Sequence, residues 1–384
     1  MKKNGHIGQL CFVFLYFFAV WPLANPARAM KSQGTPPKLF PEPKIPFAPP
    51  HYICYQALSP LMIDGRLEEL SWRRAGWTAD FVDIEGSLKP KPRFRTRAKM
   101  LWDEDYFYIG AELEEPAIWA TLTRRDSIIY HDNDFEVFID PDGDTHLYYE
   151  LEVNAFGTEW DLFLVKPYRD GGPAVHSWDI QGLKTAIFVD GTINQPEDKD
   201  KGWTVELAMP WAVLRECAPD KKPPAAGDEW RVNFSRVEYR VETREGKHEK
   251  VKDPRTGKPL PEDNWVWAPT GLINIHYPEM WGYVKFSDRN VGEGKDTFAL
   301  KPEEEAKWTL RQLYYKEKTY FLQHGKYTDK ISELGLDGVK AKGYKWPPRI
   351  VVTWTSWEAM LESEVEEGKK RVFITHDGRV FSID

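Results

Sequence analysis

Apolar and basic residues alternate along residues 93–102. One face of the pattern carries Phe94, Thr96, Ala98, Met100 and Trp102, which are apolar except for the threonine. The positions between them carry Arg93, Arg95, Arg97 and Lys99. Because successive side chains of a strand point to opposite faces, this pattern predicts a half-buried β-strand.

The same kind of pattern recurs along the next two hundred residues. It predicts strands at 106–113, 135–140, 147–156, 160–165, 185–189, 203–209, 229–240 and 281–287. The helical patches at 67–75 and 210–216 are short, and the charged stretch 241–263 is expected to form a long surface loop. Many short strands joined by polar turns predict an all-β protein, an antiparallel β-sandwich.

The pattern changes near residue 302. Apolar residues at 306, 310, 313, 314, 320 and 321 fit one face of an amphipathic helix over 302–324, closed by Gly325. Strands are predicted at 350–354, 371–375 and 379–383, which makes a small C-terminal α+β appendage. The predicted organisation is therefore a leader (1–29), a Pro-rich linker (30–50), the sandwich (51–288), a linker (289–301) and the appendage (302–384).

The N-terminus has the pattern of a signal peptide. Lys2 and Lys3 precede an apolar run over 7–23, and an Ala-Arg-Ala cleavage pattern ends at Ala29. The signal peptide predicts an exported protein, periplasmic or extracellular. No later apolar run is long enough to span a bilayer, so we expect no membrane span after cleavage. Outside the leader, Cys54 and Cys217 either form a disulfide or are two buried free thiols.

Composition narrows the choice of partner. The formal net charge is −8, which makes nucleic acid a poor partner. The chain has 17 Trp, 17 Tyr and 20 Phe, which serve either as core packing or as flat surfaces for stacking on sugars. The sequence has no HExxH, GxSxG or CxxC motif and no Gly-rich phosphate loop, so it gives little support for catalysis.

Four segments, in order, resemble the family 9 carbohydrate-binding modules (CBM9), which are DOMON-like β-sandwiches of jelly-roll type. They are PLMIDGRLEELSWRRA (60–75), DNDFEVFIDPDGDTHLYYELEVNAFGTEWD (132–161), GWTVELAMPWAVL (202–214) and VWAPTGLINIHYPEMWGYVKFSD (266–288). Separately, LRQLYYKEKTYFLQHGKYTDKISELGL (310–336) resembles the helix-to-head region of pilin-like proteins.

The CBM9 resemblance implies a sugar clamped between two aromatic rings. One clamp position falls at Tyr130, and the other at His276 or Tyr277, where family members often have Trp. Glu152 and Asn154 lie on the strand that would form the floor of the site, and Trp178 is a third platform. The competing interpretations are structural. Tyr130 would simply lie on the rim of the sandwich, and His276 and Tyr277 would pack within their loop. Trp178 would cover one end of the sandwich.

The closely spaced carboxylates Asp140, Asp142 and Asp144 are a candidate calcium site. Calcium takes six to eight oxygen ligands, and the resemblance also implies structural calcium. The spacing is not that of an EF-hand loop, and the competing interpretation is a polar hairpin turn.

The predicted function is non-catalytic capture of a poly- or oligosaccharide in carbohydrate catabolism, with glycoside hydrolases as separate partners. A first alternative, a β-sandwich glycoside hydrolase, requires two carboxylates about 5–9 Å apart across a cleft. A second is a haem-binding DOMON-type redox module that uses His276 and Met280. A third is a structural or adhesive protein that assembles through the pilin-like tail.

Overall fold

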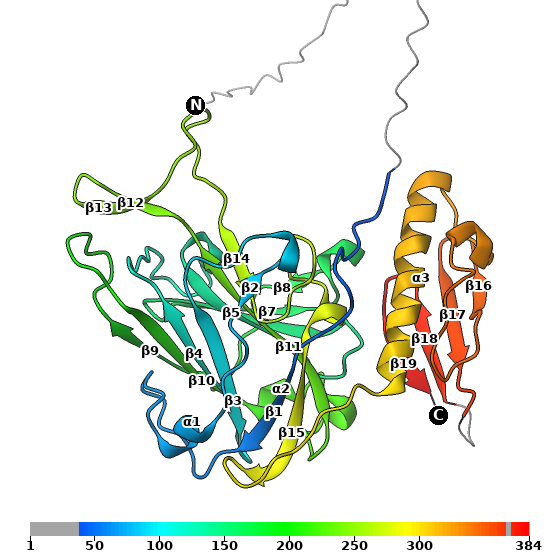
Figure 1. The fold of residues 1–384 in the computed structure, drawn as a ribbon, viewed down its shortest axis with the longest axis horizontal. Helices are drawn as coiled ribbons and strands as arrows, with labels where there is room; N and C mark the ends of the chain where they lie inside the picture. Colours follow the sequence, from blue (N-terminus) through cyan, green and yellow to red (C-terminus); the bar gives the residue numbers. More distant parts are fainter. Residues whose placement is uncertain (1–37, 366–369, 384) are drawn as a thin grey trace, which may run out of the picture. The chain divides into compact units, whose positions relative to one another are not determined.

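Two layers of β-strands packed face to face form the main body of the protein (Figure 1). The computed structural model describes residues 38–365 and 370–383. One layer has the order β8-β7-β6-β5-β11-β15 and the other β3-β4-β10-β9, with β1 between β15 and β3; β14 pairs with β11 and β2. The bounds are β1 (His51–Gln56), β2 (Val82–Asp83), β3 (Thr96–Trp102), β4 (Tyr106–Glu114), β5 (Asp134–Asp140), β6 (Tyr148–Asn154), β7 (Glu159–Leu164), β8 (Ala174–Val175), β9 (Lys184–Asp190), β10 (Gly202–Pro210), β11 (Glu229–Glu238), β14 (Asp263–Val266) and β15 (Gly282–Asn290).

The core lies between the two layers. Val137 of β5 and Leu151 of β6 belong to the same buried cluster as Ile109 of β4 and Val205 of β10. The alternation that predicted these strands is the reason, since it places every second side chain on the inner face. The predicted antiparallel β-sandwich is confirmed, although β1 runs parallel to both of its neighbours.

Short helices connect the strands. The two predicted patches are confirmed as shorter helices, and single turns of 3-10 helix occur elsewhere. Their bounds are α1 (Leu70–Arg74), α2 (Trp211–Leu214), η1 (Gly86–Leu88), η2 (Ile129–His131), η3 (Tyr168–Asp170), η4 (Pro219–Lys221), η5 (Pro278–Met280) and η6 (Ile331–Leu334).

Two expectations about the strands are wrong. The stretch predicted as a long loop contains the hairpin of β12 (Val241–Arg244) and β13 (Lys247–Lys250), and its last residue begins β14. Lys99, predicted on an exposed face of β3, is buried, and its Nζ donates to the carbonyl oxygen of Trp72 at 2.7 Å. The hydrogen bond compensates part of the cost of removing the ammonium from water.

The C-terminal part is a helix on a four-stranded sheet. Helix α3 (Pro302–His324) begins and ends at the predicted residues, and Gly325 closes it with a left-handed φ of 70°. The sheet has the order β16 (Arg349–Val352), β17 (Trp357–Glu362), β18 (Arg371–Thr375) and β19 (Val380–Ile383). The alternation predicted three of these strands and missed β17, which lies between two of them.

The segment 38–50 is not a free linker. The ring of Phe47 stacks on Trp308 with centroids 4.5 Å apart, and Phe40 meets Tyr314 edge-on. Lys316 binds the Glu42 carboxylate at 2.9 Å. Apolar side chains between the prolines therefore pack this segment along α3.

Two further expectations concern the leader and the cysteines. The predicted signal peptide and its cleavage site lie outside the described residues. Within 38–365 and 370–383, helices long and apolar enough to cross a membrane are absent. Cys54 and Cys217 are buried free thiols, so the alternative of a disulfide between them is excluded in this structure.

Candidate functional site

A cavity of about 800 Å³ opens on the outer face of the layer that contains β5, β6 and β7. Its floor carries Glu136 of β5 together with Glu150 and Glu152 of β6. These residues alternate with the inward-facing Val137 and Leu151, so the pattern that fills the core also aims the carboxylates outward. Glu136 and Glu152 are direct partners across the two strands, which puts them side by side.

Aromatic rings form one wall of the cavity. Tyr130 on η2 and Trp160 on β7 have ring centroids 6.3 Å apart, and Trp160 stacks on His176 at 6.2 Å. The Tyr130 ring is 39% exposed, while its backbone N–H donates to Glu152 Oε2 at 2.9 Å. Tyr239 also donates its hydroxyl to the Tyr130 carbonyl at 3.0 Å. The ring is therefore accessible on a backbone that is held in place.

His276 lies at the other side of the cavity beside Tyr168. The two rings meet edge-on with centroids 4.7 Å apart, and Tyr168 is half-exposed. His276 Nδ1 lies 2.9 Å from the Tyr148 hydroxyl. Burial and the nearby Arg169 guanidinium lower the pKa of His276 to about 3. The imidazole is thus neutral at pH 7, a flat polar ring and not a cation.

The floor consists of several carboxyl groups that are almost fully buried. Burial raises the pKa of Glu136 to about 7. Burial, and then the charge of Glu136, raises the pKa of Glu150 and of Glu152. Carboxylate oxygens of Asp134, Glu136 and Glu152 lie within 4.8 Å of one another. Close carboxylates in a dry environment resist ionisation unless a donor or a cation meets them.

The structure brings three of the predicted sugar-binding residues together and separates the other three. Tyr130, Glu152 and His276 all line the cavity. Tyr277 is 1% exposed; its hydroxyl donates to the Pro41 carbonyl at 3.0 Å, and its ring lies under the Arg169 guanidinium. Tyr277 therefore does not offer a ring to a ligand, because the N-terminal segment and the C-terminal part enclose it.

Asn154 and Trp178 also lie away from the cavity. The Asn154 side chain donates to the Leu122 carbonyl at 2.8 Å and accepts from the backbone N–H of Phe156 and Thr158, so it stabilises the turn after β6. Trp178 stacks at 5.0 Å on the inward-facing Tyr149 and covers the sandwich core. Neither side chain lines the cavity, because internal contacts already use both of them.

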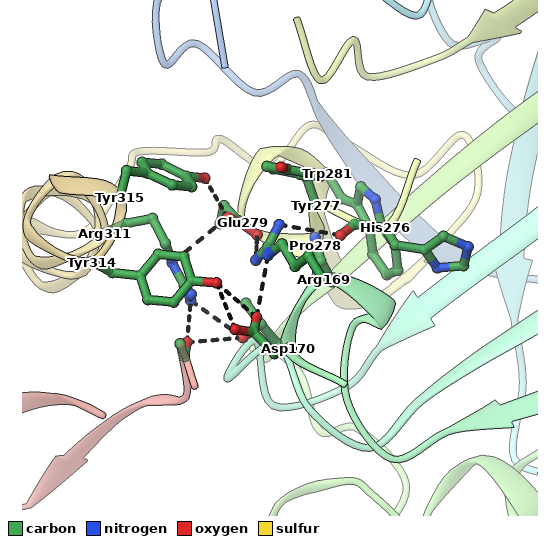
Figure 2. A network of polar contacts seen from close by, with 12 residues as sticks. Arg169, Asp170, His276, Tyr277, Pro278, Glu279, Trp281, Arg311, Tyr314 and Tyr315 are labelled. Atoms are coloured by element: carbon green, nitrogen blue, oxygen red, sulfur yellow. Dashed lines mark hydrogen bonds and ion pairs between the residues drawn. The ribbon is translucent and has the colours of Figure 1, made fainter. Parts of the chain in front are cut away.

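A buried network of charges supports the His276 side of the cavity (Figure 2). Arg169 binds Glu279 at 2.8 Å and Asp170 at 3.3 Å. On α3, Tyr314 donates its hydroxyl to Asp170 at 2.7 Å, and Tyr315 donates to Glu279. Arg169 also donates to the His276 carbonyl at 3.1 Å, so the network reaches the cavity wall itself.

The network connects the appendage to the cavity. Tyr168 immediately precedes Arg169, and His276 comes three residues before Glu279. Glu279, in the segment of His276, accepts a hydrogen bond from Tyr315 of α3. Arg169, in the segment of Tyr168, is held through its ion pair with Glu279. The appendage thus fixes one side of the cavity without lining it.

The acidic turn after β5 brings Asp140, Asp142 and Asp144 together as predicted. Their carboxylate oxygens lie within 4.8 Å of one another. Asp140 accepts the backbone N–H groups of Gly143 and Thr145, and Asp144 binds Arg379 Nε at 2.7 Å. Burial and the Asp144 charge raise the pKa of Asp142 to about 6. Oxygen ligands of this kind suit calcium, although Arg379 already neutralises one of the three.

The haem interpretation does not fit the structure. Met280 is buried among residues of the C-terminal core, and His276 Nδ1 is engaged by Tyr148. Met280 does not line the cavity that His276 faces. The two side chains therefore have no common space for a haem.

The sequence analysis missed several cavity residues. The alternation places Glu136 and Glu150 on the face opposite the core, so it could have grouped them with Glu152. Trp160 carried the same signal on β7. Tyr168, His176, Asn264 and Asn274 lie in loops, in the 3-10 turn η3 or on the short strand β14, where periodicity carries no information about contacts.

The fold and the cavity together indicate a class of protein. A sandwich with one aromatic and carboxylate-lined cavity on a sheet face is typical of a ligand-binding module. Residues 63–234 match the family model of the carbohydrate family 9 binding domain-like proteins, so this part of the sandwich is similar to that family.

Relatives with assigned names match part of this chain. The chain is 24% identical over 153 residues to the exoglucanase XynX of Acetivibrio thermocellus, which is 40% of this chain and 12% of that protein. It is 27% identical over 99 residues to endo-1,4-beta-xylanase C of Paenibacillus barcinonensis, 26% of this chain and 8% of that protein. The chain thus spans only a small part of the length of these relatives.

Among solved structures, a family 9 carbohydrate-binding module from Caldicellulosiruptor kristjanssonii in complex with cellotriose is 14% identical. It covers 65% of this chain and all of its own, with a TM-score of 0.41.

Proposed function

We propose that the sandwich binds a poly- or oligosaccharide in the cavity above β5, β6 and β7 and performs no chemistry on it. The observation that carries the proposal is the meeting of flat rings and carboxylates in one cavity, with Tyr130 and Trp160 on the wall and Glu136 and Glu152 on the floor. The match of residues 63–234 to a carbohydrate-binding family supports it.

The two kinds of residue have complementary tasks. The apolar C–H face of a pyranose packs on the ring of Tyr130 or Tyr168, and each such contact contributes about 1 kcal/mol beyond the buried area. The carboxyl groups accept hydrogen bonds from sugar hydroxyls, each contributing about 1 kcal/mol net. The backbone bonds that hold Tyr130 in place lower the entropic cost of binding.

The alternative of a glycoside hydrolase is weaker. Glu136 and Glu152 are paired residues of neighbouring strands and project from the same face of one sheet. Hydrolysis requires an acid and a second carboxylate on opposite sides of the glycosidic bond. A sugar on the floor would have both of these carboxylates on the same side.

The wider biological role rests on the same proposal. Export, a role in polysaccharide catabolism and cooperation with separate glycoside hydrolases are consistent with the hydrolase names of the two relatives. A calcium ion held by Asp140 and Asp142 would be structural, since the acidic turn is not among the residues that line the cavity.

Calorimetric titration of the purified protein with a panel of soluble glycans tests the proposal. We expect at least one glycan to bind, and we expect Tyr130→Ala and Tyr168→Ala to lower its affinity about fivefold to tenfold. Trp354→Ala is the matched control, because Trp354 is 94% exposed and does not line the cavity.

Two results would count against the proposal. Affinity that is equal in the wild type and both tyrosine variants would remove the cavity as the site. Release of reducing sugar by the purified protein, abolished by Glu136→Gln, would favour the hydrolase instead.

A further inference from the structure

The cavity has an unusual balance of charge. Among the described residues that line it, none is a lysine or an arginine. Within the described part of the chain, the basic side chains that line it are His176 and His276, and His276 is neutral at pH 7. The lining carboxylates come from five different positions: Asp126, Glu136, Glu150, Glu152 and Glu262.

One of these carboxylates has an oxygen without a partner. Glu150 is 5% exposed and lines the cavity. Its Oε2 accepts no hydrogen bond from any residue within the described ranges. A buried carboxylate oxygen that is left in this state is destabilising, because nothing replaces the hydrogen bonds it would make to water. Glu150 is therefore the group on the floor that most needs a donor from a ligand.

Three neighbouring cations are already paired with acidic side chains outside the floor. Arg169, behind His276, is buried between Asp170 and Glu279. The neighbouring cavity, which shares Glu262, Asn264 and Ile273 with this one, has basic side chains. Arg93 there binds Asp263 at 3.0 Å, and Lys89 binds Glu85 at 2.8 Å. The acidic floor is thus not neutralised by these neighbouring side chains.

We propose that the saccharide bound in this cavity carries a protonated primary amine, as in a glucosamine unit without an N-acetyl group. The inference rests on the proposed function and names the chemical class of its ligand. An ammonium group has three donors and a full positive charge, and Glu150 with its neighbours Glu136 and Glu152 offers acceptors for it.

The aromatic wall is compatible with the same ligand. A cation within about 6 Å of the face of a tyrosine or tryptophan ring is attracted by the negative face of the ring. Tyr130, Trp160 and Tyr168 line the cavity together with the carboxylates. A bare metal ion would use the carboxylates but not these rings, whereas an amino sugar uses both.

The test compares three oligosaccharides of equal length by calorimetry at pH 7. They are a β-1,4-linked glucosamine oligomer, its fully N-acetylated form and the corresponding cello-oligosaccharide. We expect the free amine to bind at least tenfold more tightly than either neutral oligomer, with an affinity that falls as salt is raised. Glu150→Gln, which removes the ionisable carboxyl group but keeps the shape, is expected to reduce this preference to less than threefold.

The outcomes separate the inference from the function on which it rests. Neutral oligomers that bind as tightly as the amine overturn the inference and leave carbohydrate binding intact. A panel in which nothing binds, including the glycans of the wider screen, overturns both. Calcium chloride alone, giving a binding heat that Glu150→Gln abolishes, would replace the amine with a metal ion. Glu112→Gln, on the outer face of β4, is the control and should leave the preference unchanged.

Discussion

Replacing Glu279 by glutamine leaves two buried guanidinium groups without the carboxylate that they share. Arg169 contacts it at 2.8 Å and Arg311 at 3.8 Å, and Tyr315 also donates to it. All three charged side chains are at least nine-tenths buried. The substitution keeps the shape of the side chain and removes only its charge.

The magnitude follows from the pKa of this residue. Burial alone would raise the pKa of Glu279, but Arg169 and Arg311, with the hydrogen bonds from Arg169 and Tyr315, lower it to about 2. Compared with the ordinary value of 4.5, this corresponds to about 3 kcal/mol of stability at pH 7. Removing one partner from a buried pair costs a similar amount, about 3–5 kcal/mol.

The pH dependence gives an independent check. Because the pKa is lowered on folding, the stabilisation is fully present above pH 4.5 and is lost as the pH falls towards 2. The difference in unfolding free energy between wild type and Glu279→Gln should therefore be about 1 kcal/mol smaller at pH 4 than at pH 7. Urea unfolding followed by tryptophan fluorescence measures it at both pH values.

The control is Glu112→Gln, which removes a half-exposed carboxylate that binds Arg95 at 2.6 Å and Arg97 at 3.1 Å. An exposed pair of this kind contributes at most about 1 kcal/mol. A Glu279→Gln protein that stays within 1 kcal/mol of wild type at pH 7, or a difference that does not shrink at pH 4, would refute the reasoning. Glycan affinity should also fall, since the network holds the segments of Tyr168 and His276.

Three other predictions follow from the packing and the acidic turn. Gly282→Ala should lower the unfolding free energy by about 1–3 kcal/mol, because its Cβ would lie 2.5 Å from the Trp267 ring; wild-type stability in urea would contradict this. Cys54 and Cys217 should not react with a thiol reagent in the folded protein and should both react in urea, and finding them in a disulfide would be the contrary result. Millimolar calcium should raise the Tm of wild type but not of Asp142→Asn, and a wild-type Tm that is insensitive to calcium would exclude the metal.

Local sequence was sufficient for much of the scaffold. Period-two alternation placed β3 to β7 and β9 to β11 within a few residues, because the side chains of a strand must alternate between core and outer face. The apolar spacing and Gly325 gave both ends of α3. The hairpin of β12 and β13 was missed because an exposed hairpin of charged residues has no apolar alternation to mark it.

The composition of the candidate site was decided by tertiary contacts. Glu136 and Glu152 share the floor because the register of β5 and β6 pairs them, and no local pattern states that register. Tyr130 and Tyr277 look equally suitable as clamp residues in the sequence. The chain leaves the ring of Tyr130 exposed, whereas Pro41 and Arg169, both more than a hundred residues away, enclose Tyr277.

The sequence by itself therefore determined the class of fold, most of the strands, the C-terminal helix and the residue types from which a sugar site can be built. Only the tertiary structure decided which of those residues meet, that three carboxylates share one floor, and that the appendage supports the cavity wall. The physical reason is the separation along the chain over which each effect acts. Backbone periodicity depends on neighbours a few residues apart. Burial and electrostatic partnership depend on chain segments brought together by the whole fold, as Arg169, Glu279 and Arg311 show.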